Sequence, residues 1–211
     1  MSMEQKEQIG SDISLAMAQE QDLRERVRGM VMRALAERSW DAAAVREVLR
    51  QVFAGVGEGL PQRGSQAAAA AREAVEGLDE ALGRSVYALQ MAMEEAWGQG
   101  RQFAETDLRA TADEVRGLES DLLSTLKESA DKGQGVAREV FASLYEHLVR
   151  NGTDTGGRVK AVLDVMNNRL AAVAHGAADE LKDQALEGRD RLKAMASGIL
   201  RGLADALDKG K

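Results

Sequence analysis

The chain has 211 residues, a net charge of −7 and a pI of about 5.1, with 21 glycines, one proline and no cysteine. The acidic balance argues against general nucleic-acid binding, which needs a basic face, and the lack of cysteine excludes disulfides and thiolate metal sites. Residues of high helix propensity dominate the composition, so we expect an all-α protein.

Two helices are expected before the single proline. The first, capped by Ser11 or Asp12, loses its apolar periodicity near Glu37. The second begins near Ser39 and ends in a run of glycines. Pro61 then marks a boundary, because proline fixes its own φ angle and disfavours helix at the residue before it.

An apolar stripe from Val75 to Leu148 organises the rest of the chain. Successive apolar positions are spaced by three, four and four residues, so the pattern repeats every eleven residues. A seven-residue repeat that starts at the same residue places several polar residues in the stripe. An eleven-residue repeat gives about 3.67 residues per turn and disfavours a left-handed coiled coil. We interpret the large apolar residues of this stripe as the surface that binds a partner: Val75, Leu78, Leu82, Val86, Leu89, Met93, Trp97, Leu108, Val115, Leu122, Leu126, Phe141, Leu144 and Leu148.

The stripe begins in one long helix, predicted over residues 65–130. Such a helix would be on the order of 100 Å long at ~1.5 Å per residue. Gly98 and Gly100 are the positions where it is most easily kinked, since interior glycine weakens a helix.

Two more helices complete the predicted fold. One spans 136–150, and after a glycine-rich loop the other spans 158–207, where the eleven-residue frame continues. We expect this last helix to pack antiparallel on part of the long one. The fold class is therefore an elongated all-α bundle, with residues 1–60 as a helical hairpin and 61–211 as a long-helix bundle, or with both in a single domain.

Basic residues recur at one place in the eleven-residue frame, about a quarter-turn from the stripe. Long side chains there can lie along an apolar surface with their charges in water, or they can form a solvated flank with salt-bridge partners. The set comprises Arg72, Arg116, Lys127, Arg138, Lys160, Lys182 and Lys193.

No pattern in the chain indicates catalysis, so we expect no catalytic residues, no cofactor and no metal ion. The two histidines, His147 and His175, lack the acidic residue three positions earlier that a di-iron bundle requires. The glycines of 152–157 resemble a phosphate loop only in part, because Arg158 and Val159 replace its Lys and Ser/Thr.

Several segments resemble an uncharacterised all-helical family of proteobacterial proteins, over nearly the whole chain. The resemblance implies no established activity. More loosely, the alanine-rich eleven-residue repeats are similar to those of phasins, apolipoproteins, perilipins and late-embryogenesis proteins. The segments that carry the family resemblance are DLRERVRGMVMRAL, REAVEGLDEALGRS, MAMEEAWGQGRQFAETDLRATADEVRGLESDLLSTL and MASGILRGLADAL.

Two functions are compatible with these patterns. The preferred one is a non-enzymatic, phasin-like protein that coats a hydrophobic surface, such as a storage granule or a membrane face. The alternative is a soluble helical bundle that binds another helical protein, with homo-oligomerisation expected. No segment reads as a signal peptide or a membrane span, so we expect a cytoplasmic protein.

Overall fold

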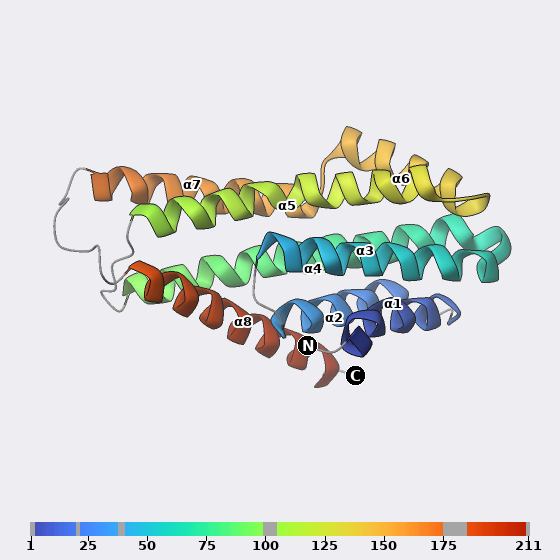
Figure 1. Ribbon diagram of the computed structural model, residues 1–211, viewed down its shortest axis with the longest axis horizontal. Helices are drawn as coiled ribbons and strands as arrows, with labels where there is room; N and C mark the ends of the chain where they lie inside the picture. Colours follow the sequence, from blue (N-terminus) through green and yellow to red (C-terminus); the bar gives the residue numbers. More distant parts are fainter. Residues whose placement is uncertain (1–2, 20–21, 38–40, 99–104, 175–184, 210–211) are drawn as a thin grey trace.

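The computed structural model describes residues 3–19, 22–37, 41–98, 105–174 and 185–209. These residues form α-helices, a short 3₁₀ helix and connecting turns, without a strand, as the composition predicts. Most helices lie along the long dimension of the molecule (Figure 1). The elements are α1 (Met3–Met17), α2 (Leu23–Ala36), α3 (Ala42–Gly59), η1 (Leu60–Gln66), α4 (Ala67–Gly98), α5 (Glu105–Lys132), α6 (Val136–Asn151), α7 (Asp154–Ala174) and α8 (Ala185–Lys209).

Helix α4 is the centre of the fold. It packs extensively against α2, α7 and α8, and it is buried on several sides. Small residues make this possible, because they let the backbones of neighbouring helices approach closely. A Cβ atom at Gly77 would lie 2.3 Å from the backbone oxygen of Arg24, and one at Gly83 would lie 2.4 Å from a carboxylate oxygen of Asp154.

The N-terminal hairpin predicted for 1–60 is wrong in detail. The expected first helix is two helices, separated by a turn in which Asp22 has a φ angle of 54°. The second helix is capped by Asp41, whose carboxylate accepts a hydrogen bond from the Ala44 N–H at 2.8 Å, while Ser39 lies outside the described residues. Helices α1 to α3 share one apolar core with the rest of the chain, so they form no separate domain.

The single long helix predicted over 65–130 is also wrong. Helix α4 ends at Gly98, α5 begins at Glu105, and Gly100 lies outside the described residues. Asp79 of α4 and Glu119 of α5 bind adjacent residues of one turn, at 2.7 Å and 2.6 Å respectively. An unbroken helix would separate these two carboxylates by about 60 Å. The chain therefore folds back between α4 and α5 instead of bending slightly.

The C-terminal helix predicted over 158–207 is divided as well. It begins earlier than expected, at Asp154, and its two parts pack in different places: α7 against α4 and α5, and α8 against α4 and α2. Figure 1 shows α7 and α8 on different sides of α4. Asp154 lies beside Asp79 and Arg158 lies over Tyr87, so α7 runs in the same direction as α4.

Three boundaries read from the sequence are confirmed. Helix α3 ends at Gly59 just before Pro61, a break falls before residue 136 as the predicted start of the 136–150 helix requires, and α6 covers 136–151. Gly135 has a φ angle of 53°, which residues with a Cβ atom rarely adopt. Within the described residues, no helix is both long enough and apolar enough to cross a membrane.

A charged cluster joins α2 to α4. Arg28 lies 2.8 Å from Glu80, Arg24 binds the other oxygen of the same carboxylate, and Arg24 also lies 3.2 Å from Glu76. Burial by itself raises the pKa of Glu80, but the hydrogen bonds from Arg24 and Arg28 outweigh it and hold that pKa below its ordinary value of 4.5. The native state therefore favours the ionised carboxylate.

We predict that Gly77→Ala destabilises the fold by about 1 to 3 kcal/mol, because the new methyl group would overlap the α2 backbone. The matched control is Gly117→Ala in α5, where a Cβ atom has space and should stabilise the helix by up to about 1 kcal/mol. Urea unfolding of both variants checks the prediction. Equal stability of the two would contradict a close α2–α4 contact.

We predict that the protein loses stability as the pH falls through the lowered pKa of Glu80. The unfolded chain binds a proton at a higher pH than the native chain does, so the stabilisation is complete above the ordinary pKa and disappears below the native one. Glu80→Gln should flatten the stability curve between about pH 5 and pH 3. The control is Glu94→Gln, at an exposed position on the same helix. Identical curves of stability against pH for the two variants would argue against a stabilising role of the charged cluster.

Candidate functional site: a cleft between α3, α5 and α6

The fourteen residues of the predicted binding stripe lie in or against the apolar core of the chain itself. Twelve are buried, and Trp97 and Leu148 are partly buried and packed on the same core. They come from α4, α5 and α6, which fold together, so they form no continuous outer surface. The twelve buried residues are Val75, Leu78, Leu82, Val86, Leu89, Met93, Leu108, Val115, Leu122, Leu126, Phe141 and Leu144.

The basic positions of the repeat frame have mixed surroundings. Lys193 is mostly buried and lies 3.0 Å from Glu114, so it serves as a salt bridge between α8 and α5. The side chain of Lys182 lies outside the described residues. The other five basic side chains are exposed: Arg72, Arg116, Lys127, Arg138 and Lys160.

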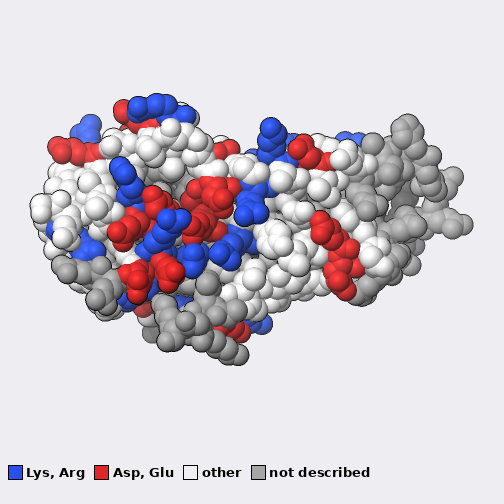
Figure 2. Space-filling view, turned by 180° about the vertical axis from the view of Figure 1, so that it is seen from behind, with Lys and Arg blue, Asp and Glu red and all other residues white. Residues whose placement is uncertain are grey.

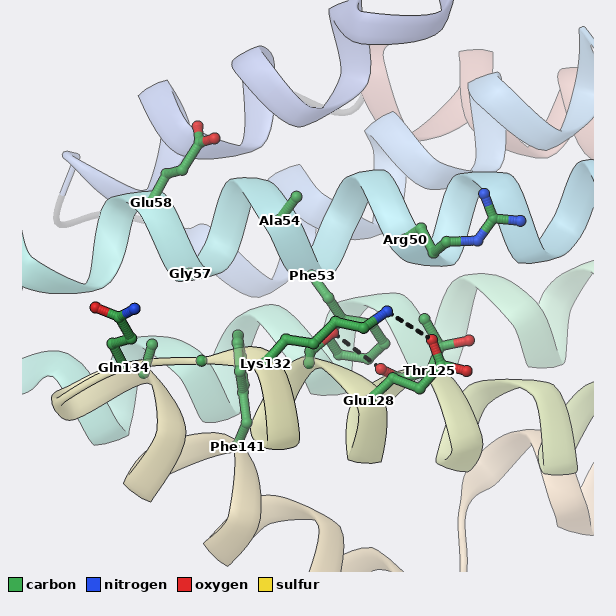
Figure 3. Close-up of a pocket in the computed structure, with 13 residues that line it drawn as sticks. Arg50, Phe53, Ala54, Gly57, Glu58, Thr125, Glu128, Lys132, Gln134 and Phe141 are labelled. Atoms are coloured by element: carbon green, nitrogen blue, oxygen red, sulfur yellow. Dashed lines mark hydrogen bonds and ion pairs between the residues drawn. The ribbon is translucent and has the colours of Figure 1, made fainter.

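The cleft is an opening of about 460 Å³ between α3 on one side and the end of α5 with the start of α6 on the other (Figure 3). Phe53 of α3 and Phe141 of α6 form its aromatic floor, with ring centres 5.9 Å apart and planes at 80°. This edge-to-face arrangement is the favourable one for aromatic pairs. Small residues, among them Ala54 and Gly57, keep the cleft open.

Charged and polar side chains surround the apolar floor. Lys132 lies 3.3 Å from Glu128, and Arg50 pairs with Glu47 on its own helix, so both cations have acidic neighbours. Glu58 and Gln134 lie toward one end, while Arg50 lies toward the other (Figure 3). The cleft therefore offers an apolar floor with a rim of both charges.

The hydroxyl groups at the cleft serve the helix backbone. Thr125 Oγ1 donates to the Asp121 carbonyl at 2.7 Å, and Ser129 Oγ donates to the Thr125 carbonyl at 2.9 Å. Among the described residues, no histidine lines the cleft. His147 is exposed on α6, where its ring contacts Asn151, and His175 lies outside the described residues. The groups that line the cleft suit the binding of an apolar side chain better than they suit a reaction.

A second polar site, which sequence reasoning missed, fixes the start of α7. Asp79 of α4 is 7% exposed, and its two carboxylate oxygens accept hydrogen bonds from the backbone N–H groups of Asp154 at 2.7 Å and Thr155 at 2.9 Å. Thr155 Oγ1 donates to the Asp79 carbonyl at 3.1 Å. The acceptor for the unpaired N–H groups of α7 thus comes from another helix, which explains why α7 begins before the predicted residue.

The sequence matches one protein-family model, described as "Family of unknown function (DUF6781)", over residues 1–209. The chain belongs to this family. No curated protein and no solved structure matched it. The family carries no assigned activity.

Partial signals for these two sites are present in the sequence. Phe141 belongs to the stripe and Phe53 to the apolar face of the second predicted helix, but nothing local shows that their rings meet. Asp79 follows Leu78 on the buried side of α4, which is an unusual place for a carboxylate. Such a residue signals a partner, yet the partner lies 75 positions away in the chain.

We predict that Phe141→Ala destabilises the fold by about 3 to 5 kcal/mol, because it removes a buried ring and its contact with Phe53. Val149→Ala on the same helix is the control. Val149 is 56% exposed, so its truncation should change stability by less than about 0.5 kcal/mol. Thermal unfolding followed by circular dichroism checks both values, and a small effect of Phe141→Ala would contradict the described floor.

Proposed function

We propose that this protein is a non-enzymatic helical-bundle protein that binds another helical protein through the cleft between α3, α5 and α6. The observation that carries the proposal is the position of the predicted stripe. Its residues are used within the chain, so the folded bundle does not need an external surface to cover them. This favours the interaction alternative over direct coating of a hydrophobic surface.

The shape of the cleft supports a protein partner. Its volume of about 460 Å³ has room for a few apolar side chains, and its open side suits a helix lying across it (Figure 3). Phe53 and Phe141 are buried and close the bottom of the cleft, so the apolar contact with a partner comes from the small residues Ala54, Gly57 and Ala137. The charged side chains at the edge form a polar rim that would exclude water once a partner is bound. The partner is either a second copy of the chain or a different protein.

The charge distribution supports a partner other than nucleic acid. Figure 2 shows acidic and basic side chains interleaved on the face it displays, without a broad basic area. Nucleic-acid binding requires a basic footprint that neutralises several phosphates. The net charge of −7 agrees with this exclusion.

A second candidate function is the coating of a lipid or granule surface, and it requires the bundle to open. One observation favours it: α4 and α5, which both carry the stripe, have little direct contact, and α7 packs against both. Departure of one helix would then expose two apolar faces together. Flotation of the protein with phospholipid vesicles, with helix content measured before and after, tests this function.

We predict that a photo-crosslinking amino acid at Ala54 captures the partner in cells that produce the full chain. Ala54 is exposed and lines the cleft, so a probe there should contact whatever binds. The control is the same probe at Ala142, which is exposed on α6 and is not among the residues that line the cleft. The adduct mass separates a second copy from another protein. Equal capture from both positions, or none from Ala54, would contradict the proposal.

A further inference from the structure

A row of exposed residues follows the outer side of α3. They are spaced by three or four positions, so they lie on one side of the helix, while the other sides of α3 pack mainly against α1 and α5. Arg46 in this row pairs with Asp121 of α5 at 3.3 Å, and the part after Arg46 borders the cleft. The row comprises Ala43, Arg46, Arg50, Ala54 and Glu58.

The middle of this row is suited to a close contact with another helix. Ala54 is exposed and carries only a methyl group, and Gly57, almost one turn further on, has no side chain. Helices that meet at small residues pack at the short end of the usual interaxial range of about 8 to 10 Å. The partner helix must also be narrow at the point of contact for its backbone to come this close. Helix α3 itself, with Ala54 at the centre of its exposed side, meets this requirement.

Opposite charges lie on the two sides of Ala54. Arg50 precedes it by four residues and Glu58 follows it by four, so each lies about 6 Å from Ala54 along the helix axis, in opposite directions. Figure 3 shows Ala54 between these two residues on α3. A two-fold axis at Ala54 would generate an antiparallel copy of α3 in which each Arg50 faces Glu58 of the other copy. The exposed side of α3 is therefore complementary to itself.

The charges of this row are available for such a contact. Glu58 is exposed, and among the described residues it has no hydrogen-bond or ion-pair partner. Arg50 pairs with Glu47 on its own helix, but a guanidinium has five N–H donors and can bind a second carboxylate. Across the cleft, Lys132 and Glu128 pair with each other. Glu58 thus lacks a cation, and Arg50 of a second copy would supply one.

We propose that the cleft binds α3 of a second copy of this chain, with the two copies related by a two-fold axis at Ala54. The inference rests on the proposed function and names the partner of its cleft. The symmetry uses each complementary feature twice, because Arg50 of either copy meets Glu58 of the other. Only one helix and the edge of the cleft take part from each copy. Small interfaces of this kind are typical of reversible association, so we expect monomer and dimer in equilibrium.

The first test reverses the charges. Arg50→Glu and Glu58→Arg each place like charges together at both contacts of the dimer, so each should weaken association by about tenfold or more in sedimentation equilibrium. An equimolar mixture of the two single variants restores opposite charges at both contacts. This mixture, and the variant with both changes, should associate about as well as the natural chain. Both positions are exposed, so helix content by circular dichroism should stay unchanged.

The controls for this test carry the same changes in net charge elsewhere. Lys160→Glu on α7 matches Arg50→Glu, and Glu94→Arg on α4 matches Glu58→Arg, and neither exposed position is among those that line the cleft. Both controls should associate like the natural chain. Equal association of all four single variants, or no recovery in the mixture, would overturn the proposal.

The second test determines the register of the contact. The natural chain has no cysteine, so Ala54→Cys gives each copy one thiol, and the two thiols meet at the proposed two-fold axis. Under mild oxidation we expect a disulfide-linked dimer. Ala142→Cys, at an exposed position of α6 that does not line the cleft, is the control and should form little of it. Equal cross-linking of the two cysteine variants would contradict the register.

The natural chain also has to associate by itself. A chain that stays monomeric at every concentration in sedimentation equilibrium would overturn the second copy as the partner. Photo-crosslinking at Ala54 in cells then decides separately whether the cleft binds a different protein, because such an adduct has a different mass. Absence of both the dimer and the adduct would overturn the proposed function as well.

Discussion

The close approach of neighbouring helices to α4 is the constraint on which this fold depends. Gly77 lets the α2 backbone touch α4, and Gly83 leaves room for the Asp154 carboxylate at the start of α7. With larger residues at these positions, the helices would stand further from α4 and the alanines between them would leave unfilled space. A chain with few aromatic residues thus obtains a dense core from short distances rather than from large side chains.

Polar contacts determine which helices pack against each part of α4. Glu80 binds two arginines of α2, and the adjacent Asp79 points to α7 and caps its first turn. Two consecutive carboxylates on α4 therefore select two different neighbours. Apolar stripes alone would allow several pairings of similar helices. An incorrect pairing would bury a carboxylate without its hydrogen-bond donors, and the free-energy cost of such a group disfavours that pairing.

The same arrangement links the fold to the proposed functions. The stripe is used inside the chain, and the buried rings of Phe53 and Phe141 close the bottom of the cleft between α3, α5 and α6. The start of α7, in contrast, is held by hydrogen bonds to Asp79 of α4 and Glu119 of α5. The cleft and the polar contacts that fix α7 are therefore features of different parts of one bundle.

The sequence by itself determined the helical class, the apolar side of each helix and the boundaries at Pro61 and before residue 136, because these depend on local propensity and on side-chain periodicity. It also identified the stripe residues that become the core. It did not determine that the chain reverses between Gly98 and Glu105, that Asp79 caps a helix 75 positions away, or that Phe53 meets Phe141. Only the tertiary structure decided these features, since a periodic stripe is satisfied equally well by an external surface, another chain or the same chain folded back. Contacts between distant residues choose among those solutions, and no local pattern contains them.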